Sequence, residues 1–278
     1  MSGFAIARLQ RSNRGSHFRA LGLHPGEMAG LIDPFLGVDH SWISGPTFPP
    51  HPHAGFSAVS YLFLDAETGI DNRDSLGTRN LIRPGGLHWT AAGRGVVHEE
   101  VPAGIGKTTH MMQIFVNLPS VRQGDAPFTL SLAPEDVPVG SRPGVRVRVP
   151  LGEFAGARSP LTPPTDVTLL DVSLEADAER IVLVEAERNA FVMPVHGTVM
   201  VDGEPFDGDA PRLPIFPALT EPRAIALRAV QGNAKVAVFT GRPLRQPVHW
   251  RGPMAMASAD ALARALTAYQ NGDFGALE

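Results

Sequence analysis

The sequence contains two pairs of metal-binding residue types, and in each pair one residue separates the two members. The first pair is His51 and His53 in His51-Pro-His53, and the second is His98 and Glu100 in His98-Glu-Glu100. Each pair lies in a stretch typical of a β-strand, where side chains two apart share a face and lie about 6–7 Å apart. Two such strands side by side would bring all four side chains to one point. Three imidazoles and one carboxylate bind a divalent transition metal and can leave coordination positions open.

Strand alternation decides which of the two neighbouring glutamates joins the histidines. In an unbroken strand, His98 and Glu100 share a face with Val96, whereas Glu99 lies on the other face. We therefore expect Glu100 to be the fourth ligand and Glu99 to be solvated or ion-paired. The glycines of the segment 93–95 allow a tight turn just before this strand.

The other histidines have weaker claims to a functional role. His88 either lines the pocket or makes a structural hydrogen bond, and His110 is expected to be structural or to support the ligands. Gln113, on an apolar strand, could orient a ligand or a substrate. Five further histidines have no partner at ligand spacing and are interpreted as structural or surface residues: His17, His24, His40, His196 and His249.

Composition excludes several classes of function. The chain has 278 residues, 43% apolar and 19% charged, enough for one large or two ordinary domains with their own cores. A net charge of −4 gives no electrostatic case for nucleic acid, and the absence of cysteine excludes disulfides, thiolate ligands and cysteine nucleophiles. The first residues contain no long apolar run, so we expect a cytoplasmic protein with no signal peptide and no membrane partner.

Short apolar, β-branched runs separated by glycine and proline recur along the chain and indicate antiparallel β-structure, a sandwich or a barrel. The runs lie at 57–64, 79–83, 96–101, 111–118, 128–132, 145–150, 167–174, 180–184, 190–201, 223–228 and 235–240. The polar, breaker-rich segment 133–144 has such runs on both sides and is interpreted as a linker. We therefore expect a domain at 1–133 with the metal site and a second at 134–278. The second half has no matching set of histidines, so no metal is expected there.

One helix is expected near the C-terminus. Ser258 can cap it, Asp260 favours its first turn, and Gly272 is placed to end it. Its apolar side chains recur at helical spacing and are expected to form a packing surface: Ala261, Leu262, Ala265, Leu266 and Tyr269.

Longer motifs surround the candidate ligands. They include His51-Pro-His53-Ala-Gly-Phe56, Tyr61-Leu62, Arg73-Asp-Ser-Leu-Gly77, Ile82-Arg-Pro-Gly85, Ala92-Gly-Arg-Gly95 and His98-x-Glu100, with Asp33-Pro-Phe-Leu36 before them and Tyr269-Gln-x-Gly-x-Phe-Gly275 near the end. In these motifs the chain resembles the pirin family of the cupin superfamily. The resemblance runs over nearly the whole chain and is weakest at 120–180.

The resemblance implies an all-β fold of two cupin-like antiparallel β-barrel domains, a bicupin, with the short C-terminal helix. It also implies one metal in the first domain, usually iron, held by His51, His53, His98 and Glu100. Some pirins are dioxygenases that open the heterocycle of the flavonol quercetin with O₂ and release carbon monoxide. Others are regulators that bind transcription factors or metabolic enzymes.

Three departures from the family pattern concern the substrate more than the metal. Ser57 stands where many pirins have a glutamate, and the segment from Tyr61 to Asp74 is longer than in most of them. His88 stands where a glutamine is common. The first two leave the four expected ligands intact and could alter which substrate enters, and His88 adds a titratable group near the pocket.

The leading hypothesis is an O₂-dependent dioxygenase of quercetin or a related enolic substrate. In it Glu100 is both a metal ligand and the catalytic base. Two alternatives stay open: a metal-dependent regulatory protein that binds a protein partner, and a metal that only stiffens the barrel. Histidine and carboxylate ligands do not select one ion, so iron comes first and Mn, Ni, Cu, Zn and Co stay open.

Overall fold

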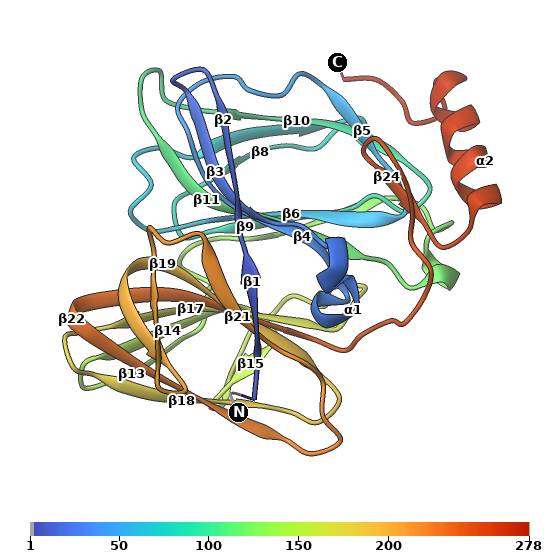
Figure 1. The fold of residues 1–278 in the computed structure, drawn as a ribbon. Coiled ribbons are helices and arrows are strands. Elements are labelled where there is room, and N and C mark those ends of the chain that lie inside the picture. Colours follow the sequence, from blue (N-terminus) through green and yellow to red (C-terminus); the bar gives the residue numbers. More distant parts are fainter. Residues whose placement is uncertain (1–2, 278) are drawn as a thin grey trace.

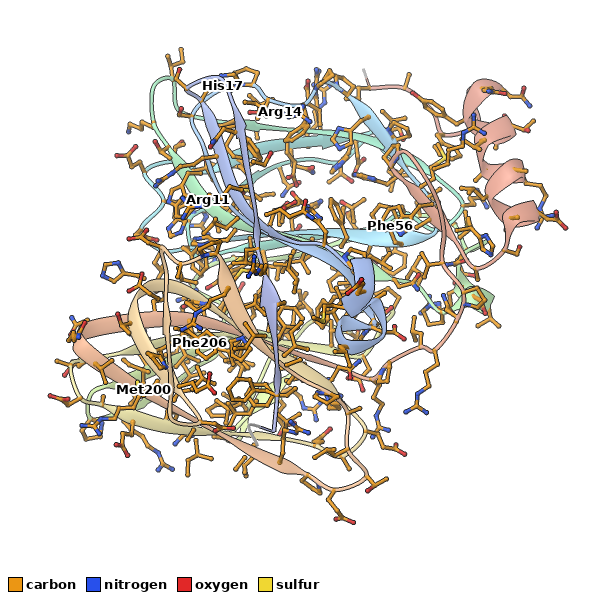
Figure 2. The ribbon with its side chains drawn as sticks, viewed as in Figure 1. Arg11, Arg14, His17, Phe56, Met200 and Phe206 are labelled. Carbon is orange, nitrogen blue, oxygen red and sulfur yellow. The ribbon has the colours of Figure 1, made fainter. Side chains whose placement is uncertain are left out.

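The computed structural model describes residues 3–277, which form two halves built mainly of antiparallel strands (Figure 1). Blue to green strands make the upper half in Figure 1, and yellow to orange strands make the lower half. The labelled Phe56 lies in the upper half and Phe206 in the lower one (Figure 2). Among the described residues, no helix is long and apolar enough to cross a membrane.

Two sheets make the first half. The larger has seven strands in the order β12 (Phe128–Leu132), β9 (Leu87–Ala91), β6 (Phe56–Leu62), β11 (Thr109–Asn117), β4 (Phe35–Ile43), β3 (Phe18–Leu23) and β2 (Gln10–Arg14). The smaller has four strands in the order β5 (His51–His53), β10 (Val96–Pro102), β7 (Ile70–Asp74) and β8 (Arg79–Ile82).

A nine-stranded sheet makes most of the second half. Seven strands follow the order β1 (Ala5–Arg8), β21 (Arg212–Phe216), β19 (Asn189–Val201), β22 (Arg223–Gly241), β17 (Val167–Leu174), β14 (Val145–Leu151) and β13 (Val139–Arg142), while β18 (Glu179–Val184) pairs with β22 and β20 (Glu204–Asp207) with β19. The remaining elements are two small hairpins, β15 (Glu153–Phe154) with β16 (Ala157–Arg158) and β23 (His249–Arg251) with β24 (Met254–Met256), the helices α1 (Ala29–Ile32) and α2 (Ala259–Gln270), and the 3₁₀ turns η1 (Gly26–Met28) and η2 (Ser120–Arg122).

The two faces of the seven-stranded sheet have different neighbours. On β6, Val59 and Tyr61 are fully buried and join one apolar core with Phe191 and Phe239 of the second half. The Tyr61 hydroxyl also donates a hydrogen bond across to the second half. On the other face of β6, the Ser60 hydroxyl bonds a carboxylate of the four-stranded sheet. Strand alternation therefore directs apolar side chains to the second half and polar ones to the space between the two sheets of the first half.

Each end of the chain packs against the half to which most of its neighbours in sequence do not belong. Strand β1 pairs with β21 of the second half, whereas β24 and α2, drawn red in Figure 1, lie against the first half beside β5. Met254 makes a bridge with Ala54, and Leu262 of α2 packs in one apolar cluster with Ala54 and Val97. The C-terminal segment therefore covers the outer side of the strands that carry the candidate ligands.

Most of the expected elements are confirmed. The antiparallel β character holds, and α2 begins after Ser258, whose side chain accepts from the amide of Ala261. Four residues of its apolar stripe pack against the first half, whereas Tyr269 is 41% exposed. The linker interpretation is wrong in part, because residues 139–142 of the segment 133–144 are β13 and pair with β14. The runs at 223–228 and 235–240 are one strand, β22. The domain boundary at 133/134 stays a prediction.

A glycine beside the ligand strand gives a test of the C-terminal packing. Gly55 has φ +83°, and a Cβ there would overlap the carbonyl oxygen of Ala255, whereas Gly272 has the same φ with open space around it. Gly272→Ala should cost about 1–2 kcal/mol of unfolding free energy, the left-handed backbone penalty alone. Gly55→Ala should cost about 1–3 kcal/mol more, because β24 must move. Urea unfolding of both variants measures the difference, and equal losses would contradict this packing.

Candidate metal centre

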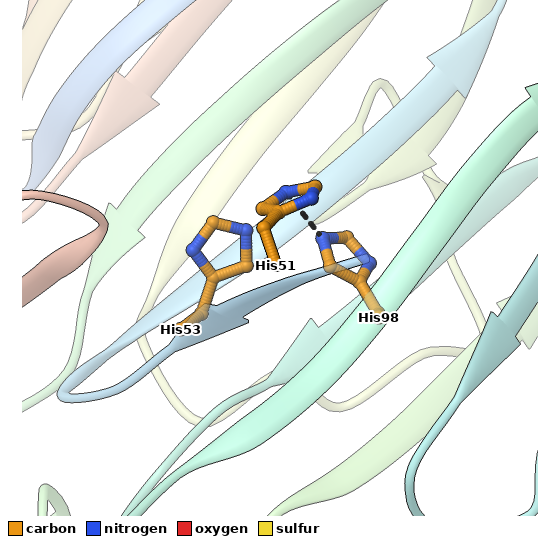
Figure 3. A group of neighbouring side chains, drawn as sticks. All are labelled: His51, His53 and His98. Atoms are coloured by element: carbon orange, nitrogen blue, oxygen red, sulfur yellow. Dashed lines mark hydrogen bonds between the residues drawn. The ribbon is translucent and has the colours of Figure 1, made fainter. Parts of the chain in front are cut away.

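Three histidine side chains converge where β5 and β10 pair. In the antiparallel register His98 lies opposite His51, and Val96 lies opposite His53. The three rings have centroids 4.6–4.8 Å apart, and their ligand nitrogens all lie within 4.8 Å of one another (Figure 3). The Nε2 atoms of His51 and His98 are 3.2 Å apart. Two nitrogens that share one ion at about 2.0–2.1 Å lie roughly 3.0–3.4 Å apart, so this spacing fits a common metal.

The second nitrogen of two of these rings is held by the backbone. His51 Nδ1 lies 2.9 Å from the Pro49 carbonyl oxygen, and His53 Nδ1 lies 3.2 Å from that of Pro253. A carbonyl can only accept, so in both rings Nδ1 carries the proton and Nε2 keeps its lone pair for a metal. The C-terminal segment thus orients a ligand of the first half.

Burial keeps the three imidazoles neutral, which is the form that binds a metal. Desolvation, with a smaller contribution from the neighbouring His51, lowers the pKa of His53 to about 3, against the opposing effect of the hydrogen bond to Pro253. Burial also lowers the pKa of His98 well below its ordinary value, with smaller contributions from the other two rings, and it lowers the pKa of His51. The residues present therefore fit a divalent transition metal by position, orientation and protonation state.

Glu100 faces the same cavity as the histidines. Its two carboxylate oxygens lie 2.8 and 2.7 Å from the Ser60 hydroxyl, which is also 3.2 Å from Gln113 Oε1. Burial raises the pKa of Glu100 to about 7, against the opposing effect of the Ser60 hydrogen bond. Glu100 is outside the group whose ligand atoms all lie within 4.8 Å, so its role as fourth ligand stays a prediction. Glu99 points to the other face and is ion-paired with Arg73 at 2.7 Å, as alternation indicated.

A cavity of about 290 Å³ lies between the two sheets of the first half. This volume is near the lower end of the ~300–1,000 Å³ of small-molecule pockets, which suits one small ligand. The four-stranded sheet contributes the histidines and Glu100, and the seven-stranded sheet contributes the facing wall. The lining side chains are Ser12, Arg14, Phe18, Ala20, His24, Asp39, Ser41, Ile43, Phe48, His51, His53, Ile70, His98, Glu100, Pro102, Gln113 and Phe115. Gln113 thus lies where a substrate would contact it.

Two departures from the family pattern lie wholly or mostly outside this cavity. Ser57 lies on the face of β6 opposite to Ser60, toward the core shared with the second half. A carboxylate missing at position 57 therefore leaves the cavity unchanged. In the longer segment from Tyr61 to Asp74, Ile70 at the start of β7 lines the cavity, whereas residues 63–69 between β6 and β7 do not. One of them, Asp65, instead accepts a hydrogen bond of 2.9 Å from His110.

The remaining singled-out histidines have structural partners or lie elsewhere. His88 is buried and bonds Ser131 and Asn72 at 2.9 and 3.2 Å, outside the cavity lining. His110 also bonds His40, with their Nε2 atoms 2.7 Å apart. His24 is the exception. The histidine spacing predicts a structural or surface residue at this position, and this prediction is wrong because His24 lines the cavity beside Asp39. The sequence signal that could have revealed it is the alternating segment before it, now seen as β3.

Two cupin-like domains with a histidine triad between the sheets of the first define a bicupin with a candidate metal centre. The chain matches the Pirin family model over residues 20–116 and the model of the Pirin C-terminal cupin domain over residues 169–275. It therefore belongs to the pirin family, which confirms the family and the two cupin-like domains expected from sequence. A relative is the Pirin-like protein of Solanum lycopersicum, 32% identical over 97% of this chain and 91% of that protein.

Solved structures of other proteins share the fold, among them one from Acinetobacter baumannii and one from Escherichia coli. The crystal structure of quercetin 2,3-dioxygenase from Acinetobacter baumannii has a TM-score of 0.85 at 24% identity, over 98% of this chain and 97% of that one. The bacterial pirin YhhW from Escherichia coli, solved in complex with nickel(II), has a TM-score of 0.67 at 19% identity, over 86% of this chain and 99% of that one.

Removing one ligand should remove the metal. We expect natively purified protein to contain one transition metal ion per chain and the His51→Ala variant to contain close to none, because two imidazoles hold an ion much less tightly than three. His196→Ala, which removes an exposed histidine of the second half, is the matched control and should keep the metal. Elemental analysis of the three proteins measures this. Equal metal content in His51→Ala and wild type would contradict the assignment.

The buried histidines also set the pH dependence of the metal-free protein. Burial lowers the pKa of His40 and His53 to about 3 and that of His88 to about 4, from 6.5. Their stabilisation is therefore complete above pH 6.5 and is lost as pH falls, because only the unfolded chain takes up protons. The raised pKa of Glu100 acts oppositely, with its stabilisation complete below pH 4.5 and lost as pH rises to about 7.

Between pH 6.5 and 4.5 the unfolded chain takes up protons on three histidines, whereas the folded chain takes up one on Glu100. The unfolding free energy should therefore fall as the pH is lowered from 6.5 to 4.5. Each excess proton taken up by the unfolded chain contributes about 1.4 kcal/mol per pH unit. Urea titrations of metal-free protein at several pH values measure the slope. A stability that is constant or rises toward pH 4.5 would show that these histidines are not held neutral.

Proposed function

We propose that this pirin is a metal-dependent dioxygenase of a planar, enolic substrate of the flavonol type. The observation that carries the proposal is the histidine triad, which shares with Glu100 a cavity large enough for one small ligand. The aromatic rings of Phe18, Phe48 and Phe115 line the same cavity and offer apolar surface to a flat ring system. The name of the structurally similar Acinetobacter protein, quercetin 2,3-dioxygenase, supports this choice of reaction.

The proposed ligands are His51, His53, His98 and Glu100, and the ion is iron, with Mn, Ni, Cu, Zn and Co as alternatives. When bound, the metal supplies positive charge that favours the ionised enol and a place where substrate and O₂ meet. The three neutral histidines and one carboxylate leave that charge only partly neutralised.

Glu100 is the proposed base as well as a ligand. The proton of the enol hydroxyl passes to a Glu100 carboxylate oxygen, so that the substrate enters the reaction as an anion. The Ser60 hydroxyl lies within hydrogen-bond distance of both oxygens of this carboxylate and of the Gln113 side-chain oxygen. Ser60 would thus hold the Glu100 side chain at the cavity wall when the carboxylate takes the substrate proton, and Gln113 would hold Ser60.

Oxygen consumption tests the proposed reaction. Protein loaded with Fe, Mn, Ni or Co should consume O₂ with quercetin and release carbon monoxide, and His98→Ala should abolish both. Glu100→Gln should lower the rate by about 10²–10⁴-fold, the usual effect of losing a positioned base. His196→Ala should retain the wild-type rate. If no enolic substrate supports oxygen uptake with any of these metals, the reaction assigned here is wrong and a binding role for the metal centre takes its place.

A further inference from the structure

The wall that faces the histidines carries a second histidine–carboxylate pair, His24 and Asp39. Both side chains line the cavity. Asp39 belongs to β4 and His24 follows β3, so the pair comes from the seven-stranded sheet, whereas the triad comes from the four-stranded sheet opposite. None of the roles assigned to the metal centre uses this pair.

A row of residues in register connects the pair to the metal centre. Ser60 on β6 lies opposite Gln113 on β11, Gln113 lies opposite Asp39 on β4, and Asp39 lies opposite Gly22 on β3. Neighbouring strands are about 4.8 Å apart, so Asp39 lies roughly 10 Å from Ser60, the residue that holds Glu100. A system of two or three linked rings spans such a distance.

The pair leaves room for a hydroxyl group. His24 Nε2 and Asp39 Oδ1 are 3.6 Å apart, too far for a direct hydrogen bond, and the side chains are 45% and 26% exposed. A hydroxyl between them can donate to the carboxylate and accept from the ring N–H of His24. Burial raises the pKa of Asp39, against the opposing effect of His24, so a further donor would favour its ionised form.

Gly22 creates the space in which the pair meets. A Cβ at this position would overlap both Asp39 Oδ1 and His24 Nε2. Any other residue at position 22 would therefore push the two side chains apart. The backbone of β3 thus leaves the space that the pair occupies.

We propose that His24 and Asp39 bind a hydroxyl group at the end of the substrate remote from the metal, and so select enols that carry a second, phenolic hydroxyl. This inference rests on the proposed function for the end of the substrate that meets the metal. In this role His24 and Asp39 determine which substrate binds, whereas the reaction takes place at the metal centre.

Binding to the metal-loaded protein without oxygen tests the proposal. Quercetin carries hydroxyls at both ends, whereas 3-hydroxyflavone carries only the enolic one. Wild type should bind quercetin at least about tenfold more tightly, the effect of one hydrogen bond to a charged group. Asp39→Asn and His24→Leu should each reduce this preference toward one and leave the affinity for 3-hydroxyflavone unchanged. The matched control is Asp65→Asn, which alters a carboxylate paired with a histidine outside the cavity and should keep the wild-type preference.

Three results would overturn the proposal: wild type shows no preference, wild type binds neither compound, or both variants keep the full preference. Melting temperature and metal content of each variant show whether it is folded, and each of the two substitutions gives the readout independently. Because no turnover occurs without oxygen, the binding result stands apart from the reaction. A wild type that prefers quercetin but consumes no O₂ would contradict the proposed function alone.

Discussion

The pairing of β5 with β10 is the interaction on which the metal centre depends. Strand β5 has only three residues, and a pair this short is not stable by itself in water. Its outer side is covered by the C-terminal segment, where Leu262 packs in one cluster with Ala54 and Val97. Ser75 joins the two parts, because its hydroxyl donates to the Phe274 carbonyl and accepts from the amide of Val97. Residues of the C-terminal segment therefore help to hold a short ladder of the first half in place.

Burial between the two sheets changes the protonation of the candidate ligands. Imidazoles and a carboxylate placed between two sheets lose their water, and each responds by favouring its neutral form, as the lowered pKa values of the histidines and the raised pKa of Glu100 show. The neutral imidazoles of the metal-free cavity are thus ready to bind a cation, whereas Glu100 must first lose its proton. On the opposite wall, Ser60, Gln113 and Asp39 form a polar row because alternation on three adjacent strands brings every second residue to the same face.

The sequence predicted those parts of the site that depend on local periodicity. The shared face of His98 and Glu100, the opposite orientation of Glu99 and the Ser258 cap follow from spacing along a single strand or helix. The pairing of His24 with Asp39 could not be predicted, because it depends on the register of β3 with β4, two strands that the apolar runs of the sequence do not indicate. The Pro253 carbonyl that orients His53 was also beyond reach, since a backbone atom 200 positions away leaves no sequence pattern. Position 57 shows the same limit: the family comparison noted the changed residue type, but only the sheet shows which face it occupies.

Coordination of the loaded metal is the most direct test of the central claim that the two strands place four ligands around one ion. A crystal structure of the metal-loaded protein, with the ion located by its anomalous scattering, should show the Nε2 atoms of His51, His53 and His98 together with one Glu100 oxygen, each at about 2.0–2.2 Å. An ion bound elsewhere, or one held by the histidines while Glu100 keeps both oxygens on Ser60, would contradict the claim.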